Sequence, residues 1–469
     1  MMGRKGAEGV LRILERTMLA ALCVWGIVEA GCGLLQLVGL QASRHALYSL
    51  TGHFINPGPF GGFIACVMAV CGAWLMRSRG EADAVGRGLR ILAWAALGAG
   101  ALVLPVSMSR TAWLALAAAL GLEALRLRPL RAWLRRNKWF GPAAAVLVVV
   151  ALAGLYLLKT ESALGRLHIW RMECRAIAEH PWTGAGPGAG LAAYGEAQEA
   201  FFRAHLETVS PTVVRVAGSP EYAFNEFLGA GMAYGLPGLL LALALVVSSI
   251  LVLYRKGSPF AAGLAAWAVF ACASYPLAAV QLRILAAAFL LMAVATGLAT
   301  LRGRAANAVP IVAAVLLGGW VAFRGGPEWD AAGEVREAYS HGYVLHQAGR
   351  YAESMAVLAR GAEKSCDPMF EVMMGKNAEA LGDDAAAGAL YEKAHYMVPS
   401  RLYPLVRQMR LRIRQGRDAE ALTLAEQIVG MPVNQRHKGM VQLLKETKVS
   451  LDSLKKVLTL SDGEKIVAE

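Results

Sequence analysis

One long uncharged stretch decides the fold class. Residues 223–254 read AFNEFLGAGMAYGLPGLLLALALVVSSILVLY, and after Glu226 no charged side chain follows until Arg255. A helix needs about 20 mostly apolar residues to cross the hydrocarbon core of a bilayer. The stretch therefore predicts a transmembrane helix.

Similar apolar runs occur along the chain up to about residue 325. The nine expected spans lie at 17–40, 54–76, 88–108, 110–126, 139–158, 223–254, 259–277, 281–300 and 306–323. The first run follows a basic start, as in a signal peptide, but it exceeds the about 7–15 residues of a signal-peptide core. The sequence predicts an all-α fold whose first domain, residues 1–325, is a polytopic membrane helical bundle.

The formal net charge of +13 could indicate nucleic-acid binding, but the placement of the charge argues against it. Basic residues gather in short loops at 77–90, 126–138, 255–256 and 302–304. Such loops are typical of the cytoplasmic side of a membrane protein. We expect a multi-pass membrane protein with a cytoplasmic N-terminus and no nucleic-acid partner.

With this orientation, residues 41–53, the turn at Ser109-Arg110 and the long segment 159–222 face the periplasm, as does the C-terminal domain. The segment 159–222 begins with a helical pattern over 164–178 and breaks at His180-Pro181. The glycines of 184–190 lack the Lys-Ser/Thr of a phosphate loop, so they predict a turn that brings the backbone close to another element.

Residues 326–469 have the composition of a soluble helical domain. Gly349, Gly382 and Gly416 recur at intervals of 33 and 34 residues. Each is followed three positions later by an alanine, namely Ala352, Ala385 and Ala419, and we expect these alanines at helix crossings. A period near 34 predicts a tetratricopeptide-like (TPR-like) α-solenoid, whose concave surface could bind a protein partner.

Several arginines are candidates for binding an anion on the periplasmic side. Arg110 lies at the outer edge of a helical hairpin, where it could also be an interface anchor. Arg166 shares a helix face with Trp170 and Glu173, and Arg171 and Arg175 form a second basic pair. The planar guanidinium group suits phosphate, so these residues favour a diphosphate ligand, although Arg166 could instead pair with Glu173.

The seven cysteines show no metal-binding spacing. Cys23, Cys32, Cys66, Cys71 and Cys272 lie within apolar runs and are interpreted as packing residues. Cys174 and Cys366 could be free or paired.

Four patches together resemble the O-antigen ligase/polymerase superfamily. They are FINPGPFGGF at 54–63, SRTAWLAL at 109–116, RLHIW at 166–170 leading to HPWTGAG at 180–186, and AFNEFL at 223–228 followed by GLPGL at 235–239. The resemblance implies a membrane fold of the lipid-sugar-dependent (GT-C-like) type. It also implies a glycosyltransferase that needs no cofactor, neither metal nor nucleotide sugar.

The resemblance implies a glycan donor linked to undecaprenyl pyrophosphate, with Arg110 and Arg166 binding the pyrophosphate. Arg171 is expected to assist them, and Asn225 and Trp170 to contact substrate. The acceptor could be lipid A-core, a growing glycan or a protein. Fixed guanidinium groups would stabilise the leaving pyrophosphate, and an in-line displacement would invert the anomeric centre.

The catalytic base is left open. Ligases of this family usually carry a histidine where this chain has Phe224. Glu226 and His180 are the candidates we favour, His168 and His205 are alternatives, and departure of pyrophosphate could make a base unnecessary. Glu226 could also be a helix-start carboxylate, and His180 a turn residue.

Two other functions remain possible on the sequence. A transporter or flippase for a lipid-linked glycan should carry charges buried in its spans, and Glu29 and Arg283 are candidates. A non-catalytic scaffold that displays the repeat domain would not depend on Arg110 or Arg166.

Overall fold

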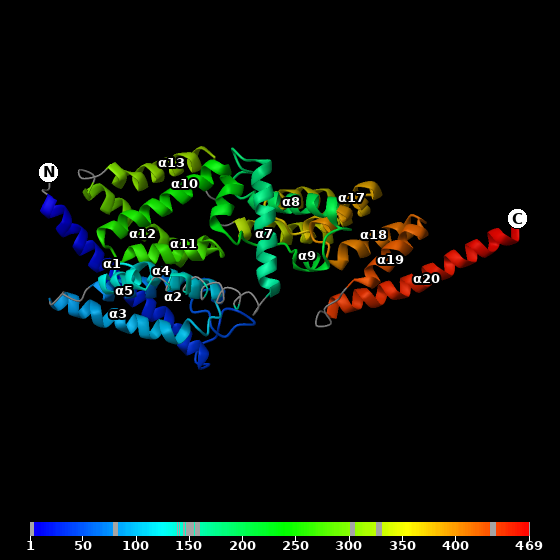
Figure 1. The fold of residues 1–469 in the computed structure, drawn as a ribbon. Coiled ribbons are helices and arrows are strands. Elements are labelled where there is room, and N and C mark those ends of the chain that lie inside the picture. The colour runs from blue at the N-terminus through cyan, green and yellow to red at the C-terminus, as the bar shows by residue number, and fades with distance from the viewer. Residues whose placement is uncertain are drawn as a thin grey trace. The chain divides into compact units, whose positions relative to one another are not determined.

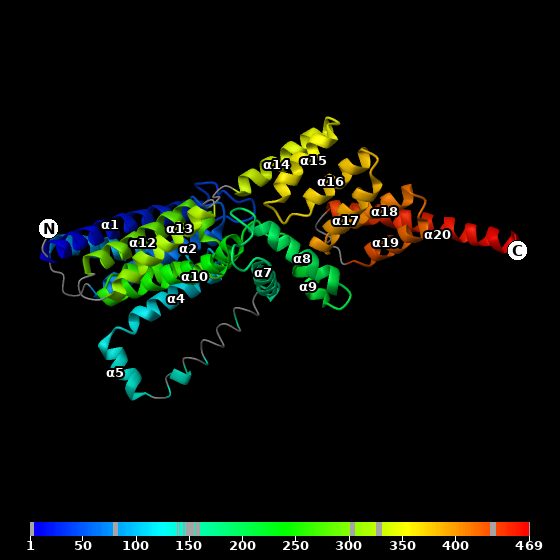
Figure 2. The same cartoon turned by 90° about the horizontal axis from the view of Figure 1, so that it is seen from above.

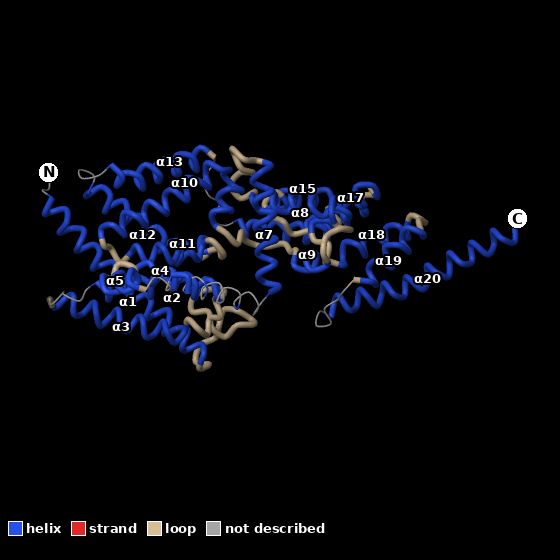
Figure 3. Tube along the Cα trace, viewed as in Figure 1, coloured by secondary structure: helices blue, strands red, loops and turns tan. Residues whose placement is uncertain are grey.

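The computed structural model describes residues 4–77, 83–137, 160–300, 305–324, 331–431 and 438–468, with isolated positions between 139 and 154. Every regular element among these residues is a helix (Figure 3). The predicted all-α fold class is confirmed. The expected span 139–158 lies outside the described residues except for those isolated positions.

The chain divides into two compact units (Figure 1). The first unit comprises Met1–Ala163, Pro181–Gly184 and Tyr222–Gly326, and the second comprises Leu164–His180, Ala185–Glu221 and Pro327–Glu469. These units do not coincide with the expected domains 1–325 and 326–469. Most of the expected periplasmic segment 159–222 groups with the C-terminal helices.

The first unit is a bundle of mostly apolar helices. It contains α1 (Arg4–Leu37), α2 (Pro57–Arg77), α3 (Ala84–Val103), α4 (Arg110–Ala124), α5 (Arg128–Arg136), α10 (Glu226–Lys256), α11 (Phe260–Ala271), η1 (Pro276–Ala278), α12 (Val280–Thr300), η3 (Ala305–Ala308) and α13 (Val309–Phe323). Four of these helices, α1, α2, α10 and α12, are long and apolar enough to cross a membrane, while α11 and α13 are shorter apolar helices. The chain is a membrane protein, as its hydropathy predicts.

Helix α2 lies at the centre of this unit, packed by α1, α3, α4 and α11. Nearly all of its residues are buried. Glycines make this packing close: a Cβ on Gly62 would lie 2.5 Å from the Phe270 ring of α11. Small residues allow helices to approach where lipid offers no hydrophobic drive for association.

The buried ion pair at one end of the bundle joins two helix termini. Arg77 ends α2, and its Nε donates to Oε2 of Glu123 near the end of α4 at 3.0 Å. The guanidinium of Arg126 lies over the Tyr254 ring, 4.1 Å from its centroid, and tethers the end of α10. Helix α5 follows and turns away from α4 without burying a residue (Figure 2). This is the end to which the sequence assigns the cytoplasmic loops.

The second unit consists of shorter helices. They are α7 (Thr160–Glu179, from Leu164 onward), α8 (Gly190–His205), α9 (Pro211–Val216), α14 (Ala331–Gln347), α15 (Tyr351–Ala362), α16 (Met369–Ala380), α17 (Asp384–Met397), α18 (Leu402–Arg414), α19 (Asp418–Gly430) and α20 (Lys438–Ala468). Helices α14 to α19 form successive hairpins. Gly349, Gly382 and Gly416 occupy their turns with φ of 75°, 84° and 70°, a region that favours glycine. The tetratricopeptide assignment itself stays a prediction.

The expectation for the alanines after these glycines is wrong. Ala352, Ala385 and Ala419 are exposed, whereas the residues two positions later, Ser354, Ala387 and Ala421, are fully buried. Both sets repeat at the same interval, so the period alone could not assign the packed face. Cys174 and Cys366 are both free thiols, the first exposed and the second buried.

Candidate functional site

Several connections gather at the other end of the first unit. This loop end is formed by the α1–α2 loop (residues 38–56), the α3–α4 turn (104–109), the start of α10 and the α11–α12 connection (272–279). Ser109 Oγ lies 3.4 Å from the carbonyl oxygen of Gly58 in the first turn of α2. A Cβ on Gly61 would lie 2.7 Å from the Cβ of Ser109. Glycine therefore lets the α3–α4 turn pack directly on α2.

Arg110 is the first residue of α4 and is half-buried at the loop end. It follows Met108, which has a φ of +52°, and Ser109, which contacts Gly58. A cation at a helix N-terminus opposes the helix dipole, so this position does not favour α4 itself. The placement instead suits a site where a negatively charged ligand approaches from the predicted periplasmic side.

Two asparagines of the sequence patches cap helices at the loop end. Asn56 Oδ1 accepts a hydrogen bond from the backbone N–H of Gly58 at 2.9 Å, at the start of α2. Asn225 Oδ1 accepts from the N–H groups of Phe227 and Leu228 at 3.0 and 3.2 Å, at the start of α10. Capping satisfies N–H groups that have no partner within the helix. The structure thus gives Asn225 a structural contact.

Glu226 also has a backbone partner. Its Oε1 accepts from the N–H of Leu277 at 2.6 Å, which joins the start of α10 to η1. Next to it, the ring of Phe224 meets Tyr275 edge-on, with centroids 5.4 Å apart, and Tyr222 stacks on the same tyrosine at 4.7 Å. Sequence reasoning missed Tyr275 as a contact of the fourth patch, because it belongs to none of the four patches.

The third and fourth patches meet within the first unit. Pro181–Gly184 lies against a break in α10 at Gly235, where the backbone has φ 72° and ψ −173°. The N–H of Leu236 donates to the carbonyl of Pro181 at 2.7 Å. A Cβ on Gly184 would lie 2.5 Å from the backbone of Tyr234. The expected close approach of the glycine-rich turn is confirmed.

The break in α10 is stabilised from outside the helix. Pro237 has no N–H to give to the carbonyl four residues before it, and Gly235 turns the backbone out of the helical region. The carbonyl of Tyr234 accepts from Trp320 Nε1 of α13 at 2.9 Å. The patch that contains Gly235 and Pro237 is thus a bend in α10, against which Pro181–Gly184 packs.

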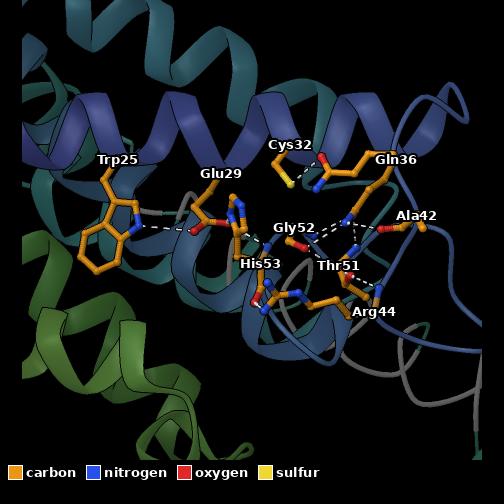
Figure 4. Close-up of polar contacts among 10 residues, drawn as sticks. Trp25, Glu29, Cys32, Gln36, Ala42, Arg44, Thr51, Gly52 and His53 are labelled. Atoms are coloured by element: carbon orange, nitrogen blue, oxygen red, sulfur yellow. Dashed lines mark hydrogen bonds and ion pairs between the residues drawn. The ribbon is translucent and has the colours of Figure 1, made fainter.

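The α1–α2 loop is held by a buried amide. Gln36 of α1 is 4 % exposed, and its Oε1 accepts from the N–H groups of Thr51 and Gly52 at 2.9 and 2.8 Å. Its Nε2 donates to the carbonyls of Gly52, at 2.9 Å, and Ala42, at 3.4 Å (Figure 4). One side chain therefore bonds four backbone groups of the loop.

The remaining predicted residues lie in the second unit. Arg166 and Trp170 are half-buried on α7, and His180 is exposed directly after it. The guanidinium groups of Arg171 and Arg175 lie 5.1 and 4.9 Å from the centroid of the Phe201 ring. The structure thus groups Arg110, Asn225 and Glu226 in one unit and Arg166, Trp170, Arg171 and His180 in the other.

A buried glutamine organises the second unit around α7 and α8. Gln198 is 1 % exposed; its Oε1 lies 3.0 Å from His168 Nε2 and accepts from the Tyr194 hydroxyl at 2.7 Å. Its Nε2 donates to the carbonyls of Gly218, at 3.1 Å, and of Met397 at the end of α17. The helices of the expected periplasmic segment are therefore fastened to a C-terminal hairpin.

Two histidines considered as bases have structural partners in this unit. Burial lowers the pKa of His168, a shift that its hydrogen bond to Gln198 opposes and that Arg171 and Arg175 reinforce. His205 lies 2.9 Å through Nδ1 from the carbonyl of Phe201 and stacks on that ring. Among the residues that the structure describes, no group of three or more His, Cys, Asp or Glu is placed to hold a metal ion.

Comparison with known proteins adds one finding to this geometry. Residues 94–243 match the family model of the O-antigen ligases. No curated protein matches the chain. The matched region begins within α3 and ends within α10, so it contains Arg110, Arg166, Asn225 and Glu226 but neither the α1–α2 loop nor the C-terminal helices.

The match to O-antigen ligases supports the resemblance seen in the sequence. It suggests glycan transfer in envelope polysaccharide biosynthesis by a glycosyltransferase-type activity. In general terms it implies a lipid-linked glycan and a glycan or lipid acceptor.

Proposed function

We propose that the protein transfers a glycan from undecaprenyl pyrophosphate to an acceptor hydroxyl at the periplasmic face of a bacterial inner membrane. The observation that carries the proposal is the ligase-family match across α4, the intervening segment and the start of α10, together with Arg110 at the loop end. The acceptor is lipid A-core, a growing glycan or a protein.

In this proposal the acceptor oxygen attacks the anomeric carbon as its bond to pyrophosphate breaks, with inversion and without a metal ion. Arg110 stabilises charge on the departing pyrophosphate, because a fixed guanidinium costs no reorganisation as that charge develops. Arg166 and Arg171 are proposed as further pyrophosphate-binding residues. Asn225 and Trp170 are proposed to contact the sugars, and Glu226 and His180 are the two candidates from the sequence for taking the acceptor proton.

The C-terminal helices are proposed to be a tetratricopeptide-like domain with a protein partner. Transport of the lipid-linked glycan is less well supported by the charges that suggested it. Glu29 is buried in α1, but its carboxylate contacts the α1–α2 loop near the end of that helix. A buried charge that holds a loop does not require a transport pathway.

Glycan transfer in membranes from cells lacking the chromosomal copy tests the proposal. Arg110→Ala and Arg166→Ala should each reduce transfer about 100-fold or more, the loss typical of removing one donor to a developing anion. Arg128→Ala, in exposed α5, is the matched control and should transfer normally. Normal transfer by both Arg110→Ala and Arg166→Ala would contradict the mechanism.

A further inference from the structure

The first helix carries a buried carboxylate that faces a histidine of the α1–α2 loop. Glu29 is 3 % exposed, and its Oε2 lies 3.2 Å from Nδ1 of His53 (Figure 4). The same oxygen accepts from the backbone N–H of His53 at 3.1 Å. The other oxygen, Oε1, accepts from Trp25 Nε1 at 3.4 Å. One backbone N–H, one indole N–H and one imidazole nitrogen therefore surround the carboxylate.

The loop backbone is shaped for this contact. Gly52, just before His53, has a φ of +56°, and a Cβ there would lie 2.9 Å from Glu29 Oε2 and 2.7 Å from the Phe60 ring. Any larger residue would separate the carboxylate from the loop. Gln36 holds the same backbone from the next turns of α1. The position of His53 is thus fixed from two sides.

The hydrogen-bond pattern decides which ring nitrogen can accept a proton. A carboxylate oxygen that accepts a hydrogen bond from Nδ1 pairs with the ring tautomer that carries its hydrogen on Nδ1. In the neutral ring the lone pair then lies on Nε2. Within the described residues Nε2 has no hydrogen-bond partner, and the side chain is 42 % exposed. A carboxylate that holds one imidazole nitrogen and leaves the other available is the usual arrangement of a general base.

His53 also lies at the end of the bundle that carries Arg110. Only the short stretch from His53 to Gly58 separates it from the first turn of α2, where Ser109 contacts Gly58 beside Arg110. His53 and Arg110 therefore flank the same helix start within the first unit. Phe224 has no basic group at the position where ligases of this family usually carry a histidine. Glu226 Oε1 and Asn225 Oδ1 already accept hydrogen bonds from backbone N–H groups.

We propose that His53, positioned by Glu29, is the general base toward the acceptor hydroxyl. The inference rests on the proposed function. The acceptor oxygen forms its bond to the anomeric carbon while the bond from that carbon to the pyrophosphate oxygen breaks. The electron pair of the broken bond leaves on pyrophosphate, and the hydroxyl proton passes to Nε2 of His53. Glu29 stabilises the imidazolium that results.

The test compares His53→Gln with Gln36→Ala in the transfer assay. His53→Gln keeps an N–H donor toward Glu29 but has no basic nitrogen, and it should lose about 100-fold or more, since general base catalysis contributes about 10²–10⁴. Glu29→Gln should lose less. Binding of radiolabelled undecaprenyl pyrophosphate should be unchanged in His53→Gln and weakened in Arg110→Ala. Added imidazole should restore part of the transfer by His53→Ala but not by Gln36→Ala.

Each outcome decides the question. Transfer by His53→Gln within about threefold of wild type would overturn the inference. So would a loss equal to that of Gln36→Ala without imidazole rescue, because it would show that His53 only shapes the loop. If wild-type membranes show no transfer at all, the proposed function fails first. If the wild type transfers and Arg110→Ala fails to bind the lipid, only the role of His53 is in question.

Discussion

The α1–α2 loop and the helices α7 to α9 are held by different cores. The α1–α2 loop is held by Gln36 and Glu29, both buried side chains of α1. The helices α7 to α9 are held in the second unit, where Gln198 joins them to the end of α17. In each case a buried amide bonds backbone groups that would otherwise lack partners.

The candidate residues therefore fall into two groups that are held in place by different parts of the molecule. His53 and Arg110 depend on the packing of membrane helices, which the sequence encodes in adjacent spans. Arg166, Arg171 and His180 lie on or next to α7, whose neighbours are fastened to C-terminal helices. The C-terminal region is therefore part of the structural support of the expected periplasmic segment, whatever further partner it binds.

Pro181–Gly184 is the exception, because it belongs to the first unit although its flanking residues belong to the second. Gly235→Ala should disrupt the packing of Pro181–Gly184 on α10 and cause the largest loss of stability. The Gly235 backbone lies in a region that only glycine adopts readily, and a Cβ would lie 2.7 Å from the backbone carbon of Trp182. We expect a loss of roughly 4 kcal/mol, combining backbone strain and overpacking.

The yield and melting temperature of the detergent-purified protein measure this effect. Gly98→Ala in α3 is the matched control, because no atom lies within 4 Å of the Cβ it would add. It should leave the melting temperature unchanged or raise it, since alanine favours helix over glycine. A Gly235→Ala protein as stable as the control would show that the break in α10 does not depend on glycine.

The sequence predicted much of this arrangement where the signal is local. Hydropathy located the long apolar helices α1, α2, α10 and α12, the recurring glycines located the hairpin turns, and the glycine-rich turn was correctly expected at a close approach. The partners of buried polar side chains were not predictable in this way. Glu29 meets His53 from 24 positions away, and Gln198 meets Met397 from 199 away. Such pairs depend on which helices pack together, which neither hydropathy nor a motif specifies.

The sequence could not separate two roles for residues whose chemistry permits both. Asn225 was expected to contact substrate, and the structure shows that its side chain caps α10. Asparagine is favoured at helix starts for this reason, so the residue type alone could not separate the roles. The repeat period likewise placed the buried small residues two positions too early, at Ala385 rather than Ala387.

A crossed pair of substitutions tests whether the two segments are held independently. Gln36→Ala removes a hydrogen-bond partner of Ala42, Thr51 and Gly52, and Gln198→Ala removes a partner of His168, Gly218 and Met397. Each should cost about 3 kcal/mol, because unsatisfied buried polar groups cost about 1–3 kcal/mol each. Hydrogen exchange should rise in residues 38–56 only for the first variant and in α7–α9 only for the second.

Increased exchange in both segments for either variant would contradict independent support. The comparison is controlled internally, since each variant serves as the reference for the segment that it leaves intact. Far-apart sites without shared partners usually show additive effects on stability. The double variant should therefore lose the sum of the two single losses.

The smallest expected effect is a loss of stability of the second unit at acidic pH. Burial lowers the pKa of His395 in α17 to about 4, and no described residue hydrogen-bonds its Nδ1. The folded state resists protonation of His395, whereas the unfolded chain accepts the proton at about pH 6.5. The free energy of unfolding is therefore highest above about pH 6.5 and falls as the pH drops toward 4. At pH 5.5 the second unit should lose about 1 kcal/mol relative to pH 7.5.

His395→Leu should remove that contribution, and thermal unfolding of the second unit followed by hydrogen exchange at the two pH values measures it. His168, whose pKa burial also lowers, should leave a residual loss in the same direction. The α1–α2 loop belongs to the first unit and both histidines belong to the second, so His395→Leu should leave exchange in residues 38–56 unchanged at both pH values. A change in loop exchange caused by His395→Leu would show that the two segments share support that their buried glutamines do not reveal.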